Sequence, residues 1–280
     1  MTVKVRVTYN PGMSREGDAQ APAGYDPRAF PPVAVSVDVV VLTIRGAHMT
    51  DGRLRGGQLS ALLVERSAPP FKGYWALPGG FVRPDETLVE AAVREVEEET
   101  GLPAFTGHLE QLGSYGDPGR DERMRVVSVA YLALMPNLPS PSAGTDASDA
   151  QWRPVSDLLG RDERALAFDH DVILADAVER ARSKLEYTNL ATSFVGTNFT
   201  LGDLRRIYEA VWDVEGLEPA NFRRKVLATG MVKKSTRPPL NRGSGRPAQL
   251  YLRGSAELLD PPMFRPEPGT RSSRKMDFAP

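Results

Sequence analysis

Residues 80–102 read GFVRPDETLVEAAVREVEEETGL, and this stretch decides the fold of the first part of the chain. It fills a pattern of nine specified positions, which begins with a glycine, ends with a glycine and an aliphatic residue, and has charged residues at fixed intervals between them. The residues in these positions are Gly80, Glu86, Arg94, Glu95, Val96, Glu98, Glu99, Gly101 and Leu102. Such spacing predicts a glycine loop that leads into a helix with carboxylates on one face.

The helix has recognisable start and stop signals. Thr87 and Glu90 are spaced as a capping box, which predicts that the helix begins directly after Thr87. Gly101 predicts a left-handed end. We expect Arg94 to pair with Glu86 and Glu90, which would orient the loop that enters the helix.

Three carboxylates dominate the second half of this helix. Glu95, Glu98 and Glu99 fall on a face that begins apolar and turns acidic. They repel one another unless a cation neutralises them, and oxygen ligands of this kind select Mg²⁺ or Mn²⁺. Because Mg²⁺ often shares its ligands with substrate phosphates, the pattern predicts a site for a divalent metal and a diphosphate. The alternative, an acidic surface helix, does not explain the fixed spacing from Gly80.

Composition limits the possible classes of protein. A chain of 280 residues, 41% hydrophobic and 25% charged, suits two globular domains. There is no cysteine, which excludes disulfides and thiolate metal sites, and three scattered histidines do not form a zinc pattern. No apolar run is long enough to span a membrane, and the first residues lack a signal peptide's apolar core. We therefore expect a cytoplasmic protein without a membrane partner.

Charge is distributed unevenly along the chain. Residues 201–253 hold 11 Lys or Arg and 5 Asp or Glu, a net charge of +6. The whole chain carries −1, so the remainder carries −7. An acidic body with a basic module near its C-terminal end indicates that the module binds a polyanion.

The first domain alternates predicted strands with predicted helices. The valine-rich segment 33–43 and the segments 58–65 and 126–134 predict strands, and 169–185 has helical periodicity. Polar or Pro/Gly-rich stretches at 46–57, 113–125 and 136–148 predict loops. This order favours an α/β fold, an α/β/α sandwich with a mixed sheet.

The second module predicts two helices and a basic hairpin. Residues 201–212 form an amphipathic helix capped by Thr200, and 219–229 form a second helix that buries Phe222, Val226 and Leu227. A basic loop at 233–246 precedes a strand at 249–252. Together these elements predict a winged helix-turn-helix domain.

The basic residues of this module predict contact with double-stranded DNA. The candidates are Asn221, Arg223, Arg224, Lys225, Lys233, Lys234, Arg242 and Arg246. A solvated helix face is the alternative, but the basic helix lies beside a basic loop, which favours DNA. RNA is disfavoured because no set of aromatic residues accompanies the charge.

Domain limits follow from these patterns. We expect an N-terminal arm at 1–32, the first domain at 33–186 and the DNA-binding domain at 187–253. A proline-rich tail at 254–280 is expected to be disordered.

Further ligand-binding candidates lie outside the acidic helix. Arg120, Arg123 and Arg125 would either clamp a diphosphate or form a solvated turn. Trp75 would either stack on a base or pack in the core. His170 has a structural and a ligand-contacting interpretation, and Asp169 is a candidate cap of the following helix.

Both domains resemble one family. Residues 80–102 resemble the Nudix box of hydrolases that act on linked nucleoside diphosphates. Together with motifs further along the chain, they resemble the Nudix-related transcriptional regulators of the NrtR family. These motifs are YDP at 25–27, the strand 37–42, APPFKGYWALPGGFV at 68–82, AFDH at 167–170, NFRRK at 221–225 and GRPAQLY at 245–251. The resemblance covers residues 24–253. It implies a homodimeric repressor of NAD synthesis or salvage genes that releases its DNA operator when ADP-ribose binds.

The resemblance also implies roles in a hydrolytic site. Glu95, Glu98 and Glu99 would hold Mg²⁺ or Mn²⁺ with the Gly80 carbonyl, supported by Arg94 and Glu86. The general base would be Glu98, Asp121 or Glu122. An intact box keeps two function classes open. The first is a repressor that senses ADP-ribose or a related nucleoside diphosphate, with or without hydrolysing it. The second is a Mg²⁺-dependent ADP-ribose pyrophosphatase with an accessory C-terminal domain.

Overall fold

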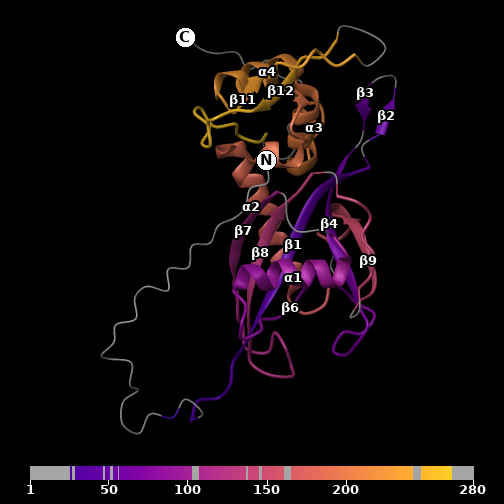
Figure 1. Cartoon of the computed structure of the whole chain (residues 1–280), viewed down its shortest axis with the longest axis vertical. Coiled ribbons are helices and arrows are strands. Elements are labelled where there is room, and N and C mark those ends of the chain that lie inside the picture. The colour runs from indigo at the N-terminus through magenta and orange to yellow at the C-terminus, as the bar shows by residue number, and fades with distance from the viewer. Residues whose placement is uncertain are drawn as a thin grey trace, which may run out of the picture.

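The computed structural model describes residues 26, 29–46, 48–50, 53–55, 57–102, 107–136, 138–144, 147–160, 165–241 and 247–266. Figure 1 shows a sheet with helices on both faces and a smaller module of helices and short strands at one end. Within these residues, every helix is too short or too polar to cross a lipid bilayer.

The first domain is built on a mixed sheet that contains seven of the described strands. They are β1 (Ala34–Arg45), β4 (Gln58–Arg66), β5 (Trp75–Ala76), β6 (Gly79–Phe81), β7 (His108–Tyr115), β8 (Val126–Leu134) and β9 (Ala147–Pro154). The order is β5-β4-β1-β8-β7, with β6 on β1 and β9 on β4, and only the β1–β8 pair is parallel among these described pairings. The predicted mixed sheet is confirmed.

Strand β1 explains why the sheet is covered on both faces. Its side chains alternate, so Val37, Val39 and Val41 pack with helix α1 (Leu88–Thr100) in one cluster. Val40 and Leu42 pack with helix α2 (His170–Tyr187) in another. Because both faces of this central strand are buried, it is valine-rich along most of its length, as expected for the middle layer of a sandwich.

The predicted caps of α1 are confirmed. The Thr87 side chain accepts a hydrogen bond from Glu90 N, and the Glu90 carboxylate accepts one from Thr87 N, which completes the capping box. Gly101 ends the helix in the left-handed conformation, with φ of 64°. These local signals fix where α1 begins and ends and therefore which way its carboxylates face.

The second domain has the predicted winged-helix architecture. The 3₁₀ segment η3 (Asn189–Phe194) leads into α3 (Leu201–Trp212) and α4 (Pro219–Ala228). Strands β10 (Phe199–Thr200), β11 (Val232–Lys234) and β12 (Leu250–Arg253) pair in the order β10-β12-β11. Thr200 caps α3 as predicted, whereas Leu227 of α4 is 40% exposed and does not join the buried set.

Helix α2 connects the two domains. Its buried residues belong to the hydrophobic cluster that also contains Leu204, Tyr208 and Trp212 of α3. Trp212 Nε1 donates to the Arg182 carbonyl at 3.2 Å, and Tyr208 donates its hydroxyl proton to the Leu185 carbonyl at 3.2 Å. In Figure 1, α2 runs behind the sheet and ends beneath the winged helix. The two domains therefore share a continuous core.

Three predicted loops contain strands. The segment 46–57 includes a short hairpin of β2 (His48–Thr50) and β3 (Arg53–Arg55). Strand β7 takes in Gly113, the start of the predicted turn region, and β9 begins at Ala147 and is followed by the 3₁₀ turn η2 (Val155–Asp157). Pairing with neighbouring strands supplies the hydrogen bonds that local sequence does not reveal.

The prediction of disorder from residue 254 onward is wrong for residues 254–266. Leu259 and Met263 are buried in the main cluster, and Met263 N donates to the Glu186 carbonyl at 2.8 Å. Arg265 forms a two-point ion pair with Glu179 of α2. Leu259, Met263 and Arg265 contact residues far away in sequence, so the proline-rich composition of this segment did not indicate that they are ordered. Residues 267–280 and most of the predicted N-terminal arm lie outside the described residues.

Candidate functional site

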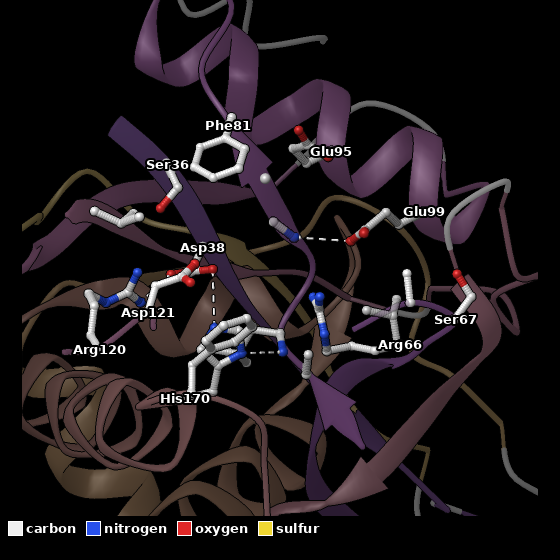
Figure 2. Close-up of a pocket in the computed structure, with 18 of the residues that line it drawn as sticks. Ser36, Asp38, Arg66, Ser67, Phe81, Glu95, Glu99, Arg120, Asp121 and His170 are labelled. Atoms are coloured by element: carbon white, nitrogen blue, oxygen red, sulfur yellow. Dashed lines mark hydrogen bonds and ion pairs between the residues drawn. The ribbon is translucent and has the colours of Figure 1, made fainter. Parts of the chain in front are cut away.

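A cavity of about 440 Å³ opens where α1, β1, β6 and the start of α2 meet. Its lining includes the charged or ionisable side chains of Asp38, Arg66, Glu95, Glu99, Arg120 and His170. Figure 2 shows these side chains pointing toward a common space. Strand β1 borders the cavity. On one side it pairs with β6 at residues 36–38 and with β4 at residues 42–45, so its partner strand changes beside the cavity.

Two glycines allow α1 to approach the strands. A Cβ atom at Gly80 would collide with Glu95 Oε1, and a Cβ atom at Gly79 would collide with the Val37 carbonyl oxygen. Gly79 N also donates a hydrogen bond to Glu99 Oε2 at 3.0 Å. Gly79 and Gly80 therefore allow two carboxylates of α1, those of Glu95 and Glu99, to lie directly against β6.

The three predicted metal-binding carboxylates have different surroundings. Glu95 and Glu99 line the cavity, whereas the 46% exposed side chain of Glu98 pairs with Arg83 and Arg94. Burial raises the pKa of Glu95, although its hydrogen bond from Arg94 opposes this. Among the described residues, no three acidic, histidine or cysteine side chains converge as a metal site.

Arg94 links α1 to the segment between β6 and the start of the helix. It donates to both oxygens of Glu86 at 2.8 and 2.6 Å and to the Phe81 carbonyl at 3.2 Å. This hydrogen bonding from Arg94 lowers the pKa of Glu86 to about 2. The expected Arg94–Glu90 pair is absent from the described contacts because Glu90 is engaged in the capping box; Arg94 contacts Glu95 and Glu98 instead.

A second polar network forms the opposite wall. Arg120 donates to both oxygens of Asp169, at 2.9 and 2.7 Å, and to Asp38 at 3.2 Å. Ser128 donates to Asp38 at 2.5 Å, and His170 Nε2 lies 3.3 Å from Asp38 Oδ1. Burial would raise the pKa of Asp38, but its neighbours His170, Ser128 and Arg120 lower it to about 2. The carboxylate is therefore ionised in this network.

The contacts of His170 identify its tautomer. Leu77 N donates to His170 Nδ1 at 2.9 Å, so Nδ1 carries a lone pair. The ring proton is then on Nε2, which faces Asp38. His170 thus links the loop before the double glycine to the first turn of α2, in agreement with its structural interpretation.

The other ligand-binding candidates separate into two groups. Arg120, Asp121 and Arg123 line the cavity, and Arg123 pairs with Asp121 at 2.7 Å. Arg120 has a side chain only 6% exposed, so it is not part of a solvated turn. Arg125 and Trp75 lie outside the lining. Trp75 packs against the main hydrophobic cluster, and the Arg153 guanidinium covers its ring at 5.3 Å, which favours core packing over stacking on a ligand.

Asp38 and Arg66 are cavity residues that sequence reasoning missed. Asp38 interrupts a run of valines in β1, and this polar residue in an apolar strand was the available signal. Arg66 ends β4 with its guanidinium 4.9 Å above the Phe168 ring. In Figure 2 it points into the space beside Glu99. A charged residue at the end of a strand is common, so nothing in the local sequence indicated that Arg66 lines the cavity.

The winged helix carries a separate basic surface. Asn221, Arg223, Arg224 and Lys225 are exposed on α4, and Lys233 and Lys234 are exposed on β11. Arg224 donates to Asn221 Oδ1 at 2.8 Å, and Arg223 donates to the Tyr251 hydroxyl at 3.3 Å. Arg242 and Arg246 lie outside the described residues.

Comparisons with known proteins agree with both sites. The model of the NUDIX domain matches residues 42–176, and that of the NrtR DNA-binding winged helix domain matches residues 191–252. The ADPR responsive transcriptional repressor NtrR of Acinetobacter baylyi is 34% identical over 231 residues, covering 82% of this chain and 85% of that protein. The ADP-ribose pyrophosphatase of Methanocaldococcus jannaschii is 43% identical over 117 residues, 41% of this chain and 63% of that enzyme.

A solved structure matches across both domains. It is NrtR of Shewanella oneidensis complexed with a 27mer DNA, with a TM-score of 0.63 and 30% identity. The match covers 82% of this chain and 99% of that chain. Fold and site together define a protein with a Nudix domain joined to a winged-helix DNA-binding domain. The Acinetobacter relative is matched over most of both lengths, so the chain belongs to the NrtR family.

Proposed function

We propose that this chain is a transcriptional repressor that binds operator DNA through its winged helix and releases it when ADP-ribose enters the Nudix cavity. The observation that carries the proposal is the shared core of α2 and α3, which joins a polar ligand cavity to a basic helix. The Acinetobacter relative is named as an ADPR-responsive repressor, which supports the same pairing of ligand and DNA.

The DNA-binding surface is proposed from exposure and charge. Helix α4 presents Arg223, Arg224 and Lys225 to solvent, and β11 adds Lys233 and Lys234 beside it. Phosphate contacts by such residues supply most of the salt-dependent affinity for a duplex. One winged helix reads one half-site, so we propose a homodimer on a palindromic operator of genes for NAD synthesis or salvage.

ADP-ribose, or a related nucleoside diphosphate, is the proposed ligand. The cavity offers the guanidinium groups of Arg66, Arg120 and Arg123 for a diphosphate. Glu95 and Glu99 face the same space from α1. Carboxylate oxygens are the ligand type that Mg²⁺ or Mn²⁺ prefers, so Glu95 and Glu99 would hold such an ion, which would neutralise their charge and lower the pKa of a water molecule.

Hydrolysis of ADP-ribose is a second candidate function. The intact set of Glu95, Glu98 and Glu99 favours it, as does the similarity of this domain to an ADP-ribose pyrophosphatase. Of the candidate bases, Asp121 lines the cavity but is held by Arg123, whose hydrogen bonds lower the pKa of Asp121. Glu98 is held outside the lining by Arg83, and Glu122 is exposed. A base role for Glu98 therefore requires it to leave these arginines.

A mobility-shift assay tests the proposal. The probe is a duplex from the region upstream of the gene for this chain, titrated with protein at two salt concentrations, with and without ADP-ribose. We expect a shift that weakens steeply with salt and is reversed by ADP-ribose. DNA binding that is unchanged by ADP-ribose would contradict the sensing function. Absence of a specific shift would favour the hydrolase as the function of this chain.

A further inference from the structure

Asp169, the residue before α2, makes an unusual side-chain contact for an aspartate at the start of a helix. Asp169 is the N-cap residue, where aspartate normally accepts a hydrogen bond from a backbone N–H of the first turn. Its side chain makes no such cap, because both carboxylate oxygens accept hydrogen bonds from Arg120. The carboxylate thus has two alternative partners, the cavity arginine and the end of its own helix.

An anion bound in the cavity would compete with the ion pairs of Arg120. Arg120 and Asp38 line the cavity and Asp169 lies behind Arg120, so one positive charge is paired here with two negative charges. A diphosphate near it is repelled by the two carboxylates unless one of them moves away. Asp38 has further partners in Ser128 and His170. The hydrogen bonds described for the Asp169 carboxylate come from Arg120, and Asp169 stands at the N-terminus of α2, where the helix dipole favours a negative charge, so it is the carboxylate that the ligand displaces.

The chain entering α2 is already under strain. Phe168, which lines the cavity and precedes Asp169, has a φ of 55°, a conformation that a residue with a side chain rarely adopts. Such strain persists where surrounding contacts hold it, and it is concentrated at switch regions. The Arg120–Asp169 ion pair is formed by the residue directly after Phe168.

We propose that the Arg120–Asp169 pair transmits ligand occupancy to the winged helix. This inference rests on the proposed function, because it takes ADP-ribose as the ligand and DNA release as the response. When the diphosphate engages Arg120, Asp169 turns toward the first turn of α2, where the helix dipole stabilises its charge, and the strained entry relaxes. The N-terminal turn of α2 then shifts relative to the sheet. Asp169 is a positioning residue in this scheme.

The other end of α2 conveys the shift to the DNA-binding domain. The helix has 18 residues and extends for about 27 Å at 1.5 Å per residue. Near its C-terminal end, Arg182 Nε donates to the Val211 carbonyl at 3.0 Å, and the Arg182 carbonyl accepts from Trp212. A rigid helix held at both ends moves α3 when its first turn moves.

The test uses Asp169→Asn in the full-length protein. Asparagine keeps the size of the side chain and is a good N-cap, but it loses the charge that holds Arg120. Three quantities are measured: affinity for the upstream duplex, affinity for ADP-ribose, and the factor by which ADP-ribose weakens DNA binding. A matched control is Asp176→Asn, since Asp176 is also on α2 and accepts a hydrogen bond from Tyr115 outside the cavity lining.

The expected changes have opposite signs. Asp169→Asn should bind ADP-ribose more tightly and the duplex more weakly, each by about 10-fold, within the 5- to 150-fold range common for allosteric coupling. The effect of ADP-ribose on DNA binding should shrink, while Asp176→Asn behaves as wild type. Loss of both affinities together, or wild-type coupling in Asp169→Asn, would overturn the proposal. Failure of the wild-type protein to release DNA with ADP-ribose would instead reject the proposed function.

Discussion

Arg223 on α4 donates a hydrogen bond to the hydroxyl of Tyr251 on β12, at 3.3 Å, and so joins the basic helix to the wing strand. The next residue, Arg224, is directed differently, because it donates to Asn221 within α4. Two adjacent arginines are thus held in different directions. Residues of a recognition helix commonly contact bases, which distinguishes Asn221 and Arg224 on α4 from the lysines of β11.

Arg224→Ala should therefore act on sequence preference. We expect it to weaken operator binding by about 1–3 kcal/mol and to relax preference at one base pair, because a base contact is lost. Lys233→Ala should weaken operator and unrelated DNA alike and reduce the slope of log affinity against log salt by about 0.9. Fluorescence anisotropy with both duplexes measures this. Unchanged affinity in an Arg223/Arg224 double alanine variant would show that α4 does not face DNA.

Gly80→Ala should disturb the ligand cavity and spare the DNA-binding domain. The added methyl group collides with Glu95, so the carboxylate or β6 must move. We expect ADP-ribose affinity measured with Mg²⁺ to fall by roughly 10-fold or more, which corresponds to about 1.4 kcal/mol. Gly196→Ala is the matched control, because its Cβ would meet open space. Equal ADP-ribose affinities in the two variants would contradict the assigned site.

Glu98→Gln separates sensing from hydrolysis. Glu98 lies outside the cavity lining, paired with Arg83 and Arg94, so its loss should leave ligand-triggered DNA release nearly intact. If the chain hydrolyses ADP-ribose with Glu98 as base, AMP formation should fall on the order of 100-fold or more. Product analysis and a DNA-release assay on the same sample measure both effects. A loss of DNA release in step with AMP formation would mean that release depends on turnover.

Met263→Ala should destabilise the protein although Met263 lies beyond the predicted DNA-binding domain. Its side chain is 3% exposed in the main cluster, and truncating a buried methionine typically costs about 2–5 kcal/mol. Phe264→Ala, one residue further on, removes a mostly exposed ring and should cost much less. Urea unfolding of both variants tests the difference. Similar losses would indicate that residues 254–266 do not dock as described.

Local signals were predictable from sequence, and long-range contacts were not. The Thr87 capping box, the Gly101 stop and the Thr200 cap depend on residues within one or two turns, so their patterns identify them directly. The limits of β8 also follow from its apolar run, and those of α3 from its hydrophobic periodicity. By contrast, Asp38 meets Arg120 and His170 only after the sheet and α2 come together. No local sequence pattern predicts these long-range contacts.

Competition between partners explains the misassigned contacts. Glu90 is one turn from Arg94, yet its carboxylate accepts a hydrogen bond from the backbone N–H of Thr87. Arg94 keeps the predicted pair with Glu86 and contacts Glu95 and Glu98 in place of Glu90. Leu227 has the spacing of a buried residue, but α4 is short and buries only Phe222 and Val226. Sequence spacing shows which contacts are geometrically allowed, whereas the folded environment decides which of them forms.

The central claim is that one ligand cavity and one DNA surface are energetically linked. Calorimetric titration of ADP-ribose into the protein, with and without saturating operator duplex, tests it most directly. Linkage requires that DNA weaken ADP-ribose binding by the same factor by which ADP-ribose weakens DNA binding. We predict a lower ADP-ribose affinity in the DNA complex, by a factor within roughly 5- to 150-fold. Equal ADP-ribose affinities in the two titrations would show that ADP-ribose is not the effector of this protein.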